Sequence, residues 1–200
     1  MIVAGLTGSI AMGKSETARM FAELGVPVFD ADAAVHEMYA KGGAAVGAIA
    51  ARFPQAIVDD VADRQRLAEL VLNDPAALRT LENIVHPLVR SAEARFIRKC
   101  RAENRPLAVV DIPLLFETGR QHEFDRVIVV SAPAGMQRER ALTRSGMTKE
   151  KFAAIQARQV SDADKRRQAH FIVDSSRGLD HALAQVKIIV AKLMREAAAS

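Results

Sequence analysis

The chain has 200 residues, of which 50% are hydrophobic and 26% charged, and its formal net charge at pH 7 is +4. This length and composition predict one compact soluble domain with a real core and small appended lobes. The modest charge does not demand a nucleic-acid partner, and no apolar stretch is long enough to cross a bilayer. A single cysteine, Cys100, excludes an internal disulfide framework. We therefore expect a cytoplasmic protein that binds neither nucleic acid nor membrane.

The first elements follow a strand–helix–strand pattern. Residues 2–6 are a continuous apolar run bounded by glycine, which is typical of a strand buried on both faces of a parallel sheet. The spacing then predicts a helix over 14–24, which Gly25 ends. A second strand is predicted over 26–30, with acidic residues at its carboxyl end.

The segment 33–104 carries no convincing strand. Pro87 should break or kink its last long helix, because proline lacks the backbone N–H that an α-helix needs. A helical insert of this size is too large for a plain crossover between two strands, so we interpret it as a substrate lobe. The helix-like segments are 33–40, 45–53, 64–72, 75–85 and 88–104.

Beyond the insert, strands alternate with helices again. Strands are predicted over 106–116, 126–132 and 171–176, with charge-rich helices over 134–168 and an amphipathic helix over 179–197. This alternation predicts an α/β fold with a doubly wound parallel five-stranded sheet.

Residues 8–15 read GSIAMGKS and match G-x-x-x-x-G-K-[ST], with an apolar strand before and a helix after. In this motif, backbone N–H groups and the helix dipole attract phosphate oxygens. Gly13 permits the tight backbone, Lys14 can bridge the β- and γ-phosphates, and the Ser15 hydroxyl can bind Mg²⁺. The alternative, a glycine turn with a solvated lysine, is disfavoured by this context.

The nucleotide is predicted to be ATP. The loop does not match the dinucleotide fingerprint G-x-G-x-x-G, which disfavours a Rossmann oxidoreductase. No N-K-x-D guanine signature occurs, which disfavours a GTPase.

Three acidic residues lie where apolar strand-like runs end: Asp30, Asp32 and Asp111. The carboxyl ends of parallel strands line the ligand crevice of open α/β sheets. A kinase needs carboxylates there to hold Mg²⁺ and to orient an acceptor hydroxyl. Asp32 has a second interpretation, as the N-cap of the helix that follows.

Arginines in the segment 134–168 suggest a lid. Arg140 and Arg144 are four residues apart on one predicted helix face, and Arg158 follows one helix later. Such side chains can stabilise the charge on a transferring phosphoryl group. The competing interpretation is a solvated charged face.

Five segments together resemble the motifs of the dephospho-CoA kinase family. They occur in the same order and spacing between residues 5 and 176, and they read GLTGSIAMGKS, VPVFDADAAVH, VHPLVR, VVDIPLLFE and HFIVDSS. The resemblance implies a P-loop kinase that transfers the ATP γ-phosphate to the ribose 3′-hydroxyl of dephospho-CoA, with Mg²⁺ as cofactor. It implies a core of about 1–32, 105–133 and 169–200, a coenzyme lobe of about 33–104 and a lid of about 134–168. A monomer or weak homo-oligomer is expected.

The resemblance also assigns residues. Asp32 matches the proposed catalytic base, Lys14 the phosphate-binding lysine and Arg140 a lid arginine near the ATP phosphates. Ser15 and Asp111 would hold the metal. The expected ATP-binding residues are Gly8, Ala11, Met12, Gly13, Lys14, Ser15 and Glu16, and the expected substrate-binding residues are His86, Pro87, Arg90, Asp111 and Leu114. From the residues alone, His86 can equally be the neighbour of a helix-ending proline with a satisfied ring.

The loop departs from the common family pattern. Ser9, Ala11 and Met12 replace three small or flexible positions, and Glu16 stands where Ser or Thr is usual. Backbone donors survive these changes, so we expect phosphate binding to persist. Met12 is expected to narrow the loop, and Glu16 to weaken nucleotide affinity through charge repulsion.

Two rival functions stay open at this stage. One is another P-loop kinase that acts on a nucleotide or a small alcohol such as shikimate. The other is a non-catalytic ATP-binding regulator or a nucleic-acid-linked NTPase, which the absence of Trp and the presence of a single Tyr disfavour.

Overall fold

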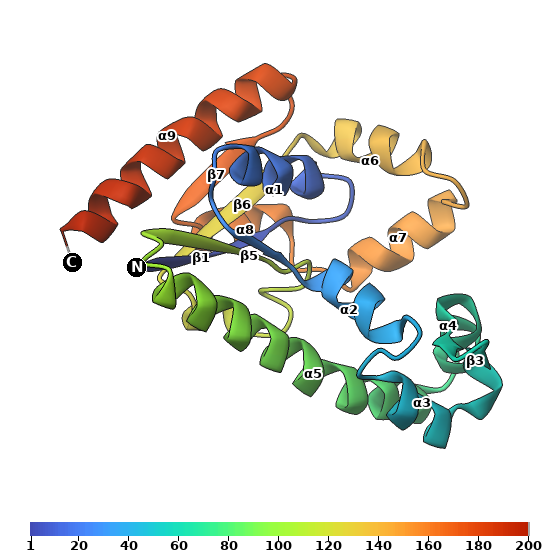
Figure 1. The fold of residues 1–200 in the computed structure, drawn as a ribbon. Helices are drawn as coiled ribbons and strands as arrows, with labels where there is room; N and C mark the ends of the chain where they lie inside the picture. Colours follow the sequence, from blue (N-terminus) through green and yellow to red (C-terminus); the bar gives the residue numbers. More distant parts are fainter. Residues whose placement is uncertain (200) are drawn as a thin grey trace. The chain divides into compact units, whose positions relative to one another are not determined.

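The computed structural model describes residues 1–199. The chain divides into two compact units, a core unit of Met1–Phe29 with Lys99–Ser200 and an insert unit of Asp30–Arg98. Figure 1 shows the elements of both units along the chain. None of the helices in the described range combines the length and apolarity needed to cross a bilayer.

The core unit is built on a five-stranded parallel sheet, which confirms the predicted fold class. Its strand order is β2-β5-β1-β6-β7, and residues of β1 pair with both β5 and β6. The sheet is therefore doubly wound about β1, whose six residues are all buried. The strands are β1 (Ile2–Thr7), β2 (Val28–Asp30), β5 (Leu107–Asp111), β6 (Arg126–Ser131) and β7 (Phe171–Asp174).

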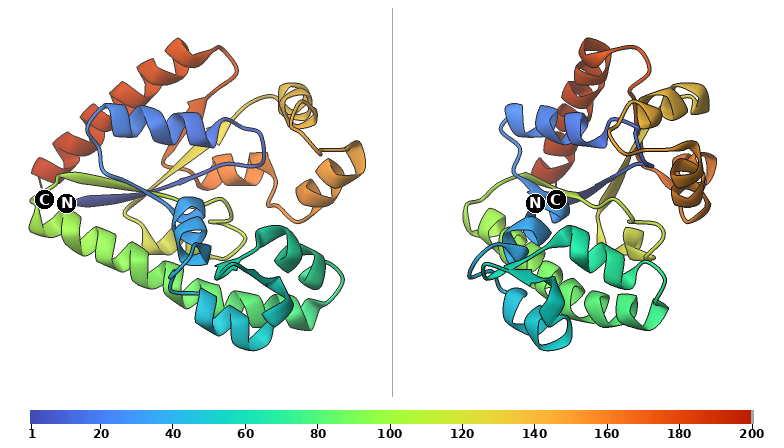
Figure 2. Two further views of the ribbon diagram at one scale, coloured as in Figure 1. Left: turned by 45° about the vertical axis from the view of Figure 1, so that its right-hand side comes forward. Right: turned by 90° about the vertical axis from the view of Figure 1, so that its right-hand side faces the viewer.

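Helices α1 (Lys14–Glu23) and α9 (Leu179–Ala198) lie side by side on one face of this sheet. Phe21, Val186 and Leu193 are completely buried there against apolar strand residues. Burying side chains of this size contributes about 1.5–3 kcal/mol each. Figure 2 shows the start of β1 and the end of α9 at the same edge of the unit.

The charge-rich segment 134–168 is helical, as predicted. It forms α6 (Ala134–Leu142), α7 (Lys149–Ala157) and α8 (Asp162–Gln168), and α8 packs against β6. The segment before β6 carries a short 3-10 helix, η2 (Arg120–Glu123).

The insert unit has its own hydrophobic core, whose buried members include Met38, Tyr39, Ile49, Phe53, Leu67 and Val85. Its elements are α2 (Ala31–Tyr39), α3 (Val46–Arg52), the 3-10 helix η1 (Pro54–Ala56), strands β3 (Ile57–Val58) and β4 (Val61–Ala62), α4 (Arg64–Val71) and α5 (Pro75–Ala102).

The expectation of an insert without strands is wrong, because β3 and β4 form a small antiparallel hairpin. Its loop residues Asp59 and Asp60 have φ angles of 49° and 64°. Two consecutive left-handed residues are the geometry of a type I′ hairpin turn. Strands of two residues are too short to produce an alternation of apolar and polar residues. The Asp59-Asp60 pair was therefore the one feature of the sequence that could have indicated a turn here.

Of the break or kink expected at Pro87, the break is wrong, because α5 continues through this residue. Proline removes one i to i−4 hydrogen bond at a cost of about 3 kcal/mol. Packing offsets this cost, since Val85 is buried before Pro87 and Leu88 and Val89 pack against the same core after it. Tertiary contacts on both sides therefore hold the helix together.

Candidate active site

The phosphate loop, defined as Gly8–Ser15, connects β1 to α1 at the carboxyl edge of the sheet. Gly13 is the N-cap of α1 and has a left-handed φ of 92°, which glycine adopts without steric cost. Gly8 is required for another reason, because a Cβ atom there would lie 2.7 Å from the carbonyl oxygen of Val130.

The end of the loop presents unused hydrogen-bond donors. The Met12 N–H donates to Ser9 O at 3.2 Å, and the Thr17 N–H donates to Gly13 O at 3.1 Å. Within residues 1–199, the backbone N–H groups of residues 13–16 have no protein acceptor. Free N–H groups at a helix N-terminus, together with the helix dipole, form a site for an anion such as phosphate.

Lys14 and Asp111 are brought together beside the loop. The Lys14 Nζ atom lies 2.5 Å from Asp111 Oδ1, and the two side chains are 15% and 2% exposed. Asp111 is the last residue of β5, next to β1 in the sheet, so the doubly wound topology sets this pair. Ser15 is exposed in the first turn of α1.

Arg140 reaches the phosphate loop through Ser175. Its guanidinium donates to Ser175 Oγ at 2.9 Å and to Ser175 O at 2.8 Å, while the Ser175 hydroxyl donates to Met12 O at 2.7 Å. Arg140 and Arg144 also line a cavity of about 270 Å³ together with Gly13 and Glu16. The expected lid arginine therefore lies beside the second half of the loop.

The departures in the loop have visible local consequences. Ala11 adopts a left-handed φ of 61°, a conformation in which glycine is less strained. The Met12 side chain is 2% exposed, and its sulfur accepts the Ala132 N–H at 3.1 Å. The Glu16 carboxylate accepts hydrogen bonds from the Arg19 guanidinium at 2.9 and 3.1 Å, which offsets part of its negative charge.

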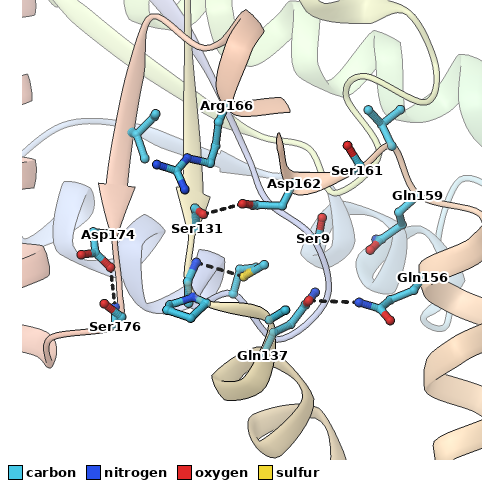
Figure 3. A pocket seen from close by; sticks show the side chains of 16 residues that line it. Ser9, Ser131, Gln137, Gln156, Gln159, Ser161, Asp162, Arg166, Asp174 and Ser176 are labelled. Atoms are coloured by element: carbon cyan, nitrogen blue, oxygen red, sulfur yellow. Dashed lines mark hydrogen bonds between the residues drawn. The ribbon is translucent and has the colours of Figure 1, made fainter. Parts of the chain in front are cut away.

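A larger cavity of about 760 Å³ borders the loop at Ser9 and Met12 (Figure 3). Asp162 accepts the Ser131 hydroxyl at 2.8 Å on its wall. Hydrogen bonds from Ser176 lower the pKa of Asp174, because they stabilise the ionised carboxylate. With Arg166 as its single cationic lining residue, this cavity suits polar uncharged groups better than a triphosphate.

Asp30 and Asp32 have different roles at the start of α2. The Asp30 carboxylate is the N-cap and accepts the Ala33 N–H at 2.9 Å. The capping interpretation of Asp32 is therefore wrong, because the helix begins at Ala31, two residues earlier than the sequence predicts. Asp32 is exposed, and its carboxylate has no hydrogen bond or ion pair among the described residues.

His86, Pro87 and Arg90 lie on the exposed side of α5 in the insert unit. His86 and Arg90 are four residues apart and so share one helix face. Because α5 does not end at Pro87 and the His86 ring makes no hydrogen bond within residues 1–199, the explanation of His86 as a satisfied neighbour of a helix end is wrong. Leu114, in the core unit after β5, is 45% exposed.

Sequence reasoning missed a buried ion pair. Lys165 of α8 is 0% exposed and lies 2.9 Å from Glu117. Nothing in the charge pattern of α8 distinguishes Lys165 from its exposed neighbours Arg166 and Arg167. Glu117 stands in the VVDIPLLFE segment, which gave the only hint that this position matters.

Comparison with known proteins gives a consistent result. The family model described as dephospho-CoA kinase matches residues 1–181. The dephospho-CoA kinase of Mesorhizobium japonicum is 54% identical over 193 residues, covering 96% of this chain and 97% of that protein. The dephospho-CoA kinase of Rhodopseudomonas palustris strain HaA2 is 53% identical over 190 residues, covering 95% and 94%. A crystal structure from Thermus thermophilus is similar with a TM-score of 0.82 and 32% identity, covering 96% of this chain and 97% of that one. The chain belongs to the dephospho-CoA kinase family.

Proposed function

We propose that this protein transfers the γ-phosphate of ATP to the ribose 3′-hydroxyl of dephospho-CoA, giving CoA and ADP, the final step of coenzyme A synthesis. The observation that carries the proposal is the family match over residues 1–181, together with a phosphate loop whose last N–H groups are free. The relatives that bear this name cover almost the whole chain.

ATP would bind with its phosphates at the N-terminus of α1. The free N–H groups of residues 13–16 would hold phosphate oxygens, and Lys14 would turn from Asp111 towards the β- and γ-phosphates. Arg140, held near the loop by Ser175, would add positive charge beside the transferring group. The nucleoside would then occupy the cavity of about 270 Å³ beside the phosphate loop.

Ser15 and Asp111 are the residues that would hold Mg²⁺. The donor set fits, because this ion is usually bound by a hydroxyl or carboxylate oxygen or two, with phosphates and waters completing the shell. Asp111 meets the requirement because it is a carboxylate fixed beside Lys14 at a strand end, and Ser15 because its hydroxyl is exposed. When bound, the ion neutralises developing charge on the phosphate oxygens.

Asp32 would orient the 3′-hydroxyl and accept its proton. Both acids are exposed, but Asp30 is engaged as the helix cap, so Asp32 is the one whose carboxylate has no hydrogen bond among the described residues. A general base must be available to the hydroxyl that it deprotonates. His86, Pro87, Arg90, Asp111 and Leu114 would contact the coenzyme, with residues 33–104 as the coenzyme lobe and 134–168 as the lid.

The direct test mixes purified protein, Mg²⁺-ATP and dephospho-CoA, and follows the products by mass spectrometry. We expect ADP and a coenzyme heavier by one phosphoryl group in equal amounts. ATP binding without CoA formation would support the nucleotide site but contradict dephospho-CoA as the acceptor. A panel of nucleotides and shikimate would then test the rival kinase function, which the family match does not favour.

The proposal also includes action in the cytoplasm as a monomer or weak homo-oligomer, with no nucleic-acid partner. Light scattering over a range of concentrations would test the oligomeric state. Salt-dependent binding of DNA or RNA would contradict the last statement.

A further inference from the structure

We propose that Lys165 is a positioning residue that holds the phosphate loop in its ATP-binding conformation through Ser9. The inference rests on the proposed function only in taking ATP as the ligand of the loop. It assigns to a buried ion pair a role in nucleotide affinity, beyond a role in folding.

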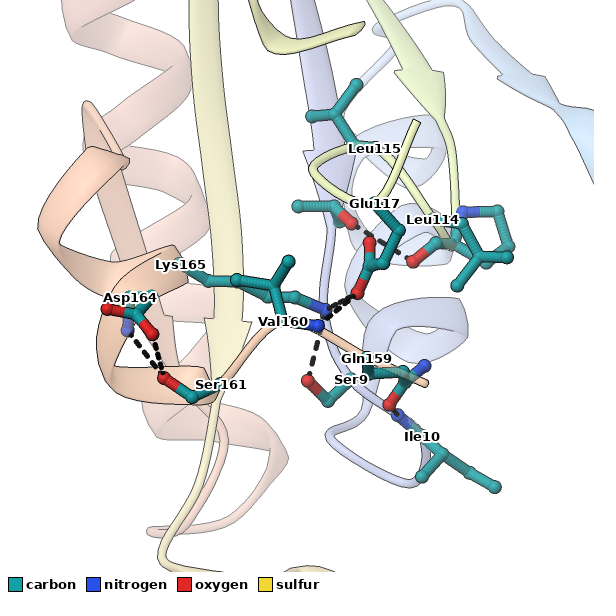
Figure 4. Close-up of polar contacts among 12 residues, drawn as sticks. Ser9, Ile10, Leu114, Leu115, Glu117, Gln159, Val160, Ser161, Asp164 and Lys165 are labelled. Atoms are coloured by element: carbon teal, nitrogen blue, oxygen red, sulfur yellow. Dashed lines mark hydrogen bonds and ion pairs between the residues drawn. The ribbon is translucent and has the colours of Figure 1, made fainter. Parts of the chain in front are cut away.

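Lys165 connects three segments that are distant in sequence (Figure 4). Its ammonium lies 2.9 Å from Glu117 Oε1 and donates to Ser9 Oγ at 3.2 Å. Ser9 belongs to the phosphate loop, Glu117 to the segment after β5, and Lys165 to α8. A completely buried ammonium persists only when it is paired and hydrogen-bonded, so these two partners fix its position.

Two glutamines of the segment 134–168 also form hydrogen bonds with Ile10, the next residue of the phosphate loop. The Ile10 N–H donates to Gln159 Oε1 at 3.1 Å, and Ile10 O accepts from Gln137 Nε2 at 2.9 Å. Glu117 Oε1 also accepts the Val160 N–H at 2.9 Å, which ties the chain before α8 to the same carboxylate. The first half of the phosphate loop is therefore held by the lid segment, while its second half leaves donors free for the ligand.

The contact depends on the Ser9 hydroxyl, because a glycine at position 9 would offer Lys165 no side-chain acceptor. Preorganising the loop reduces the ordering cost of ligand binding. The buried charge is also fixed close to the place where the phosphates are expected.

A purely structural ion pair would affect stability alone, and a charge-neutral double variant separates the two possibilities. K165M leaves the Glu117 carboxylate buried without its cation, so we expect a large loss of Tm. E117Q/K165M removes both charges and retains an amide oxygen for the Val160 N–H, so we expect most of the Tm to return. Because the hydrogen bond from Lys165 to Ser9 is lost in this variant, its affinity for ATP should be about tenfold weaker.

The measurement is the Kd for Mg²⁺-ATP by titration calorimetry without acceptor, beside Tm by scanning calorimetry. S9A should weaken ATP binding about threefold, with no further loss when it is added to E117Q/K165M. T148A is the matched control: Thr148 caps α7 by accepting the Lys151 N–H at 3.2 Å, and its removal should lower Tm without changing the Kd.

Three results would overturn the inference: recovery of both Tm and ATP affinity in E117Q/K165M, a fully additive effect of S9A in that background, or an equal loss of affinity in T148A. Failure of the wild type to bind ATP would contradict both proposals. ATP binding without CoA formation would contradict the proposed function alone, and the variants would still decide the role of Lys165.

Discussion

The ammonium of Lys14, the first residue of α1, lies 2.5 Å from the carboxylate of Asp111, the last residue of β5. The lysine that we propose for the nucleotide phosphates is thus paired with a protein carboxylate. On that proposal, binding of ATP would exchange this carboxylate for phosphate oxygens, and a metal ion beside Asp111 would favour that exchange.

The first prediction concerns this pair. D111N should lower kcat by about 10²–10³, because both the metal carboxylate and the lysine's partner are lost. In EDTA, D111N should bind ATP at least as well as the wild type, because Lys14 no longer has a competing anion. Calorimetric titrations with and without Mg²⁺ check this. An equal gain from Mg²⁺ in both proteins would contradict the metal role of Asp111.

Asp32 and Asp30 should respond differently to substitution. D32N should lower kcat by about 10²–10⁴, as expected for a lost general base, with the Kd for ATP unchanged. D30A should instead lower the free energy of unfolding by about 1 kcal/mol, because it removes the cap of α2. Steady-state kinetics and urea unfolding distinguish the two. Unaltered turnover in D32N would refute its assigned role.

Replacement of Arg140 by lysine should lower kcat even though the positive charge is kept. Its planar guanidinium makes two hydrogen bonds to Ser175, and a single ammonium does not reproduce that fork. R140K should therefore lose kcat nearly as strongly as R140M, by about 10- to 100-fold. S175A, which keeps the carbonyl acceptor, should lose less. Turnover of R140K close to wild type would show that the charge alone is sufficient.

Glu16 should have opposite effects on affinity and on stability. E16Q removes a carboxylate that faces the expected nucleotide cavity, so ATP should bind about two- to threefold tighter, a modest gain because Arg19 already offsets that charge. The same change removes an acid from the first turn of α1 and should slightly lower Tm. Because exposed charges are screened, the gain in affinity should vanish in 0.5 M salt; a gain that persists would indicate another cause.

Cys100 should react slowly with thiol reagents. It is 3% exposed, and burial, followed by the nearby Glu103, raises the pKa of its thiol. A raised pKa favours the protonated thiol in the folded protein. The free energy of unfolding should therefore be unaffected by Cys100 below the ordinary cysteine pKa and should fall as pH rises through the raised folded value. Iodoacetamide labelling followed by mass spectrometry at pH 8 should be much slower than in urea. Equal rates would contradict this.

The sequence was sufficient to predict the strands of the core sheet and the phosphate loop, because both depend on local patterns. Continuous apolar runs marked β1, β5 and β6, and the glycines of the loop stand at fixed offsets from Lys14. The acid at the end of β5 was also predictable, since a carboxylate that follows a buried run lies at the ligand edge of a parallel sheet.

The features that sequence reasoning missed depend on contacts between distant residues. Lys165 is 156 positions from Ser9, and only the folded chain brings α8 beneath the phosphate loop. Continuation of α5 through Pro87 likewise depends on packing within the insert unit, which overrides local helix preference. The capping interpretation of Asp32 failed because the pattern placed the start of the helix two residues late.

Gly8 and Gly13, the two glycines of the phosphate loop, differ in the reason why a larger residue would disturb the structure. At position 8 the obstacle is the Val130 carbonyl oxygen, 2.7 Å from a Cβ atom, and a backbone atom inside the sheet has no other rotamer to adopt. At position 13 the obstacle is a dihedral angle, with Ser175 at 3.3 Å as a softer neighbour. Of these two positions, codon 8 should therefore tolerate genetic variation less, because even alanine there requires the strand itself to move.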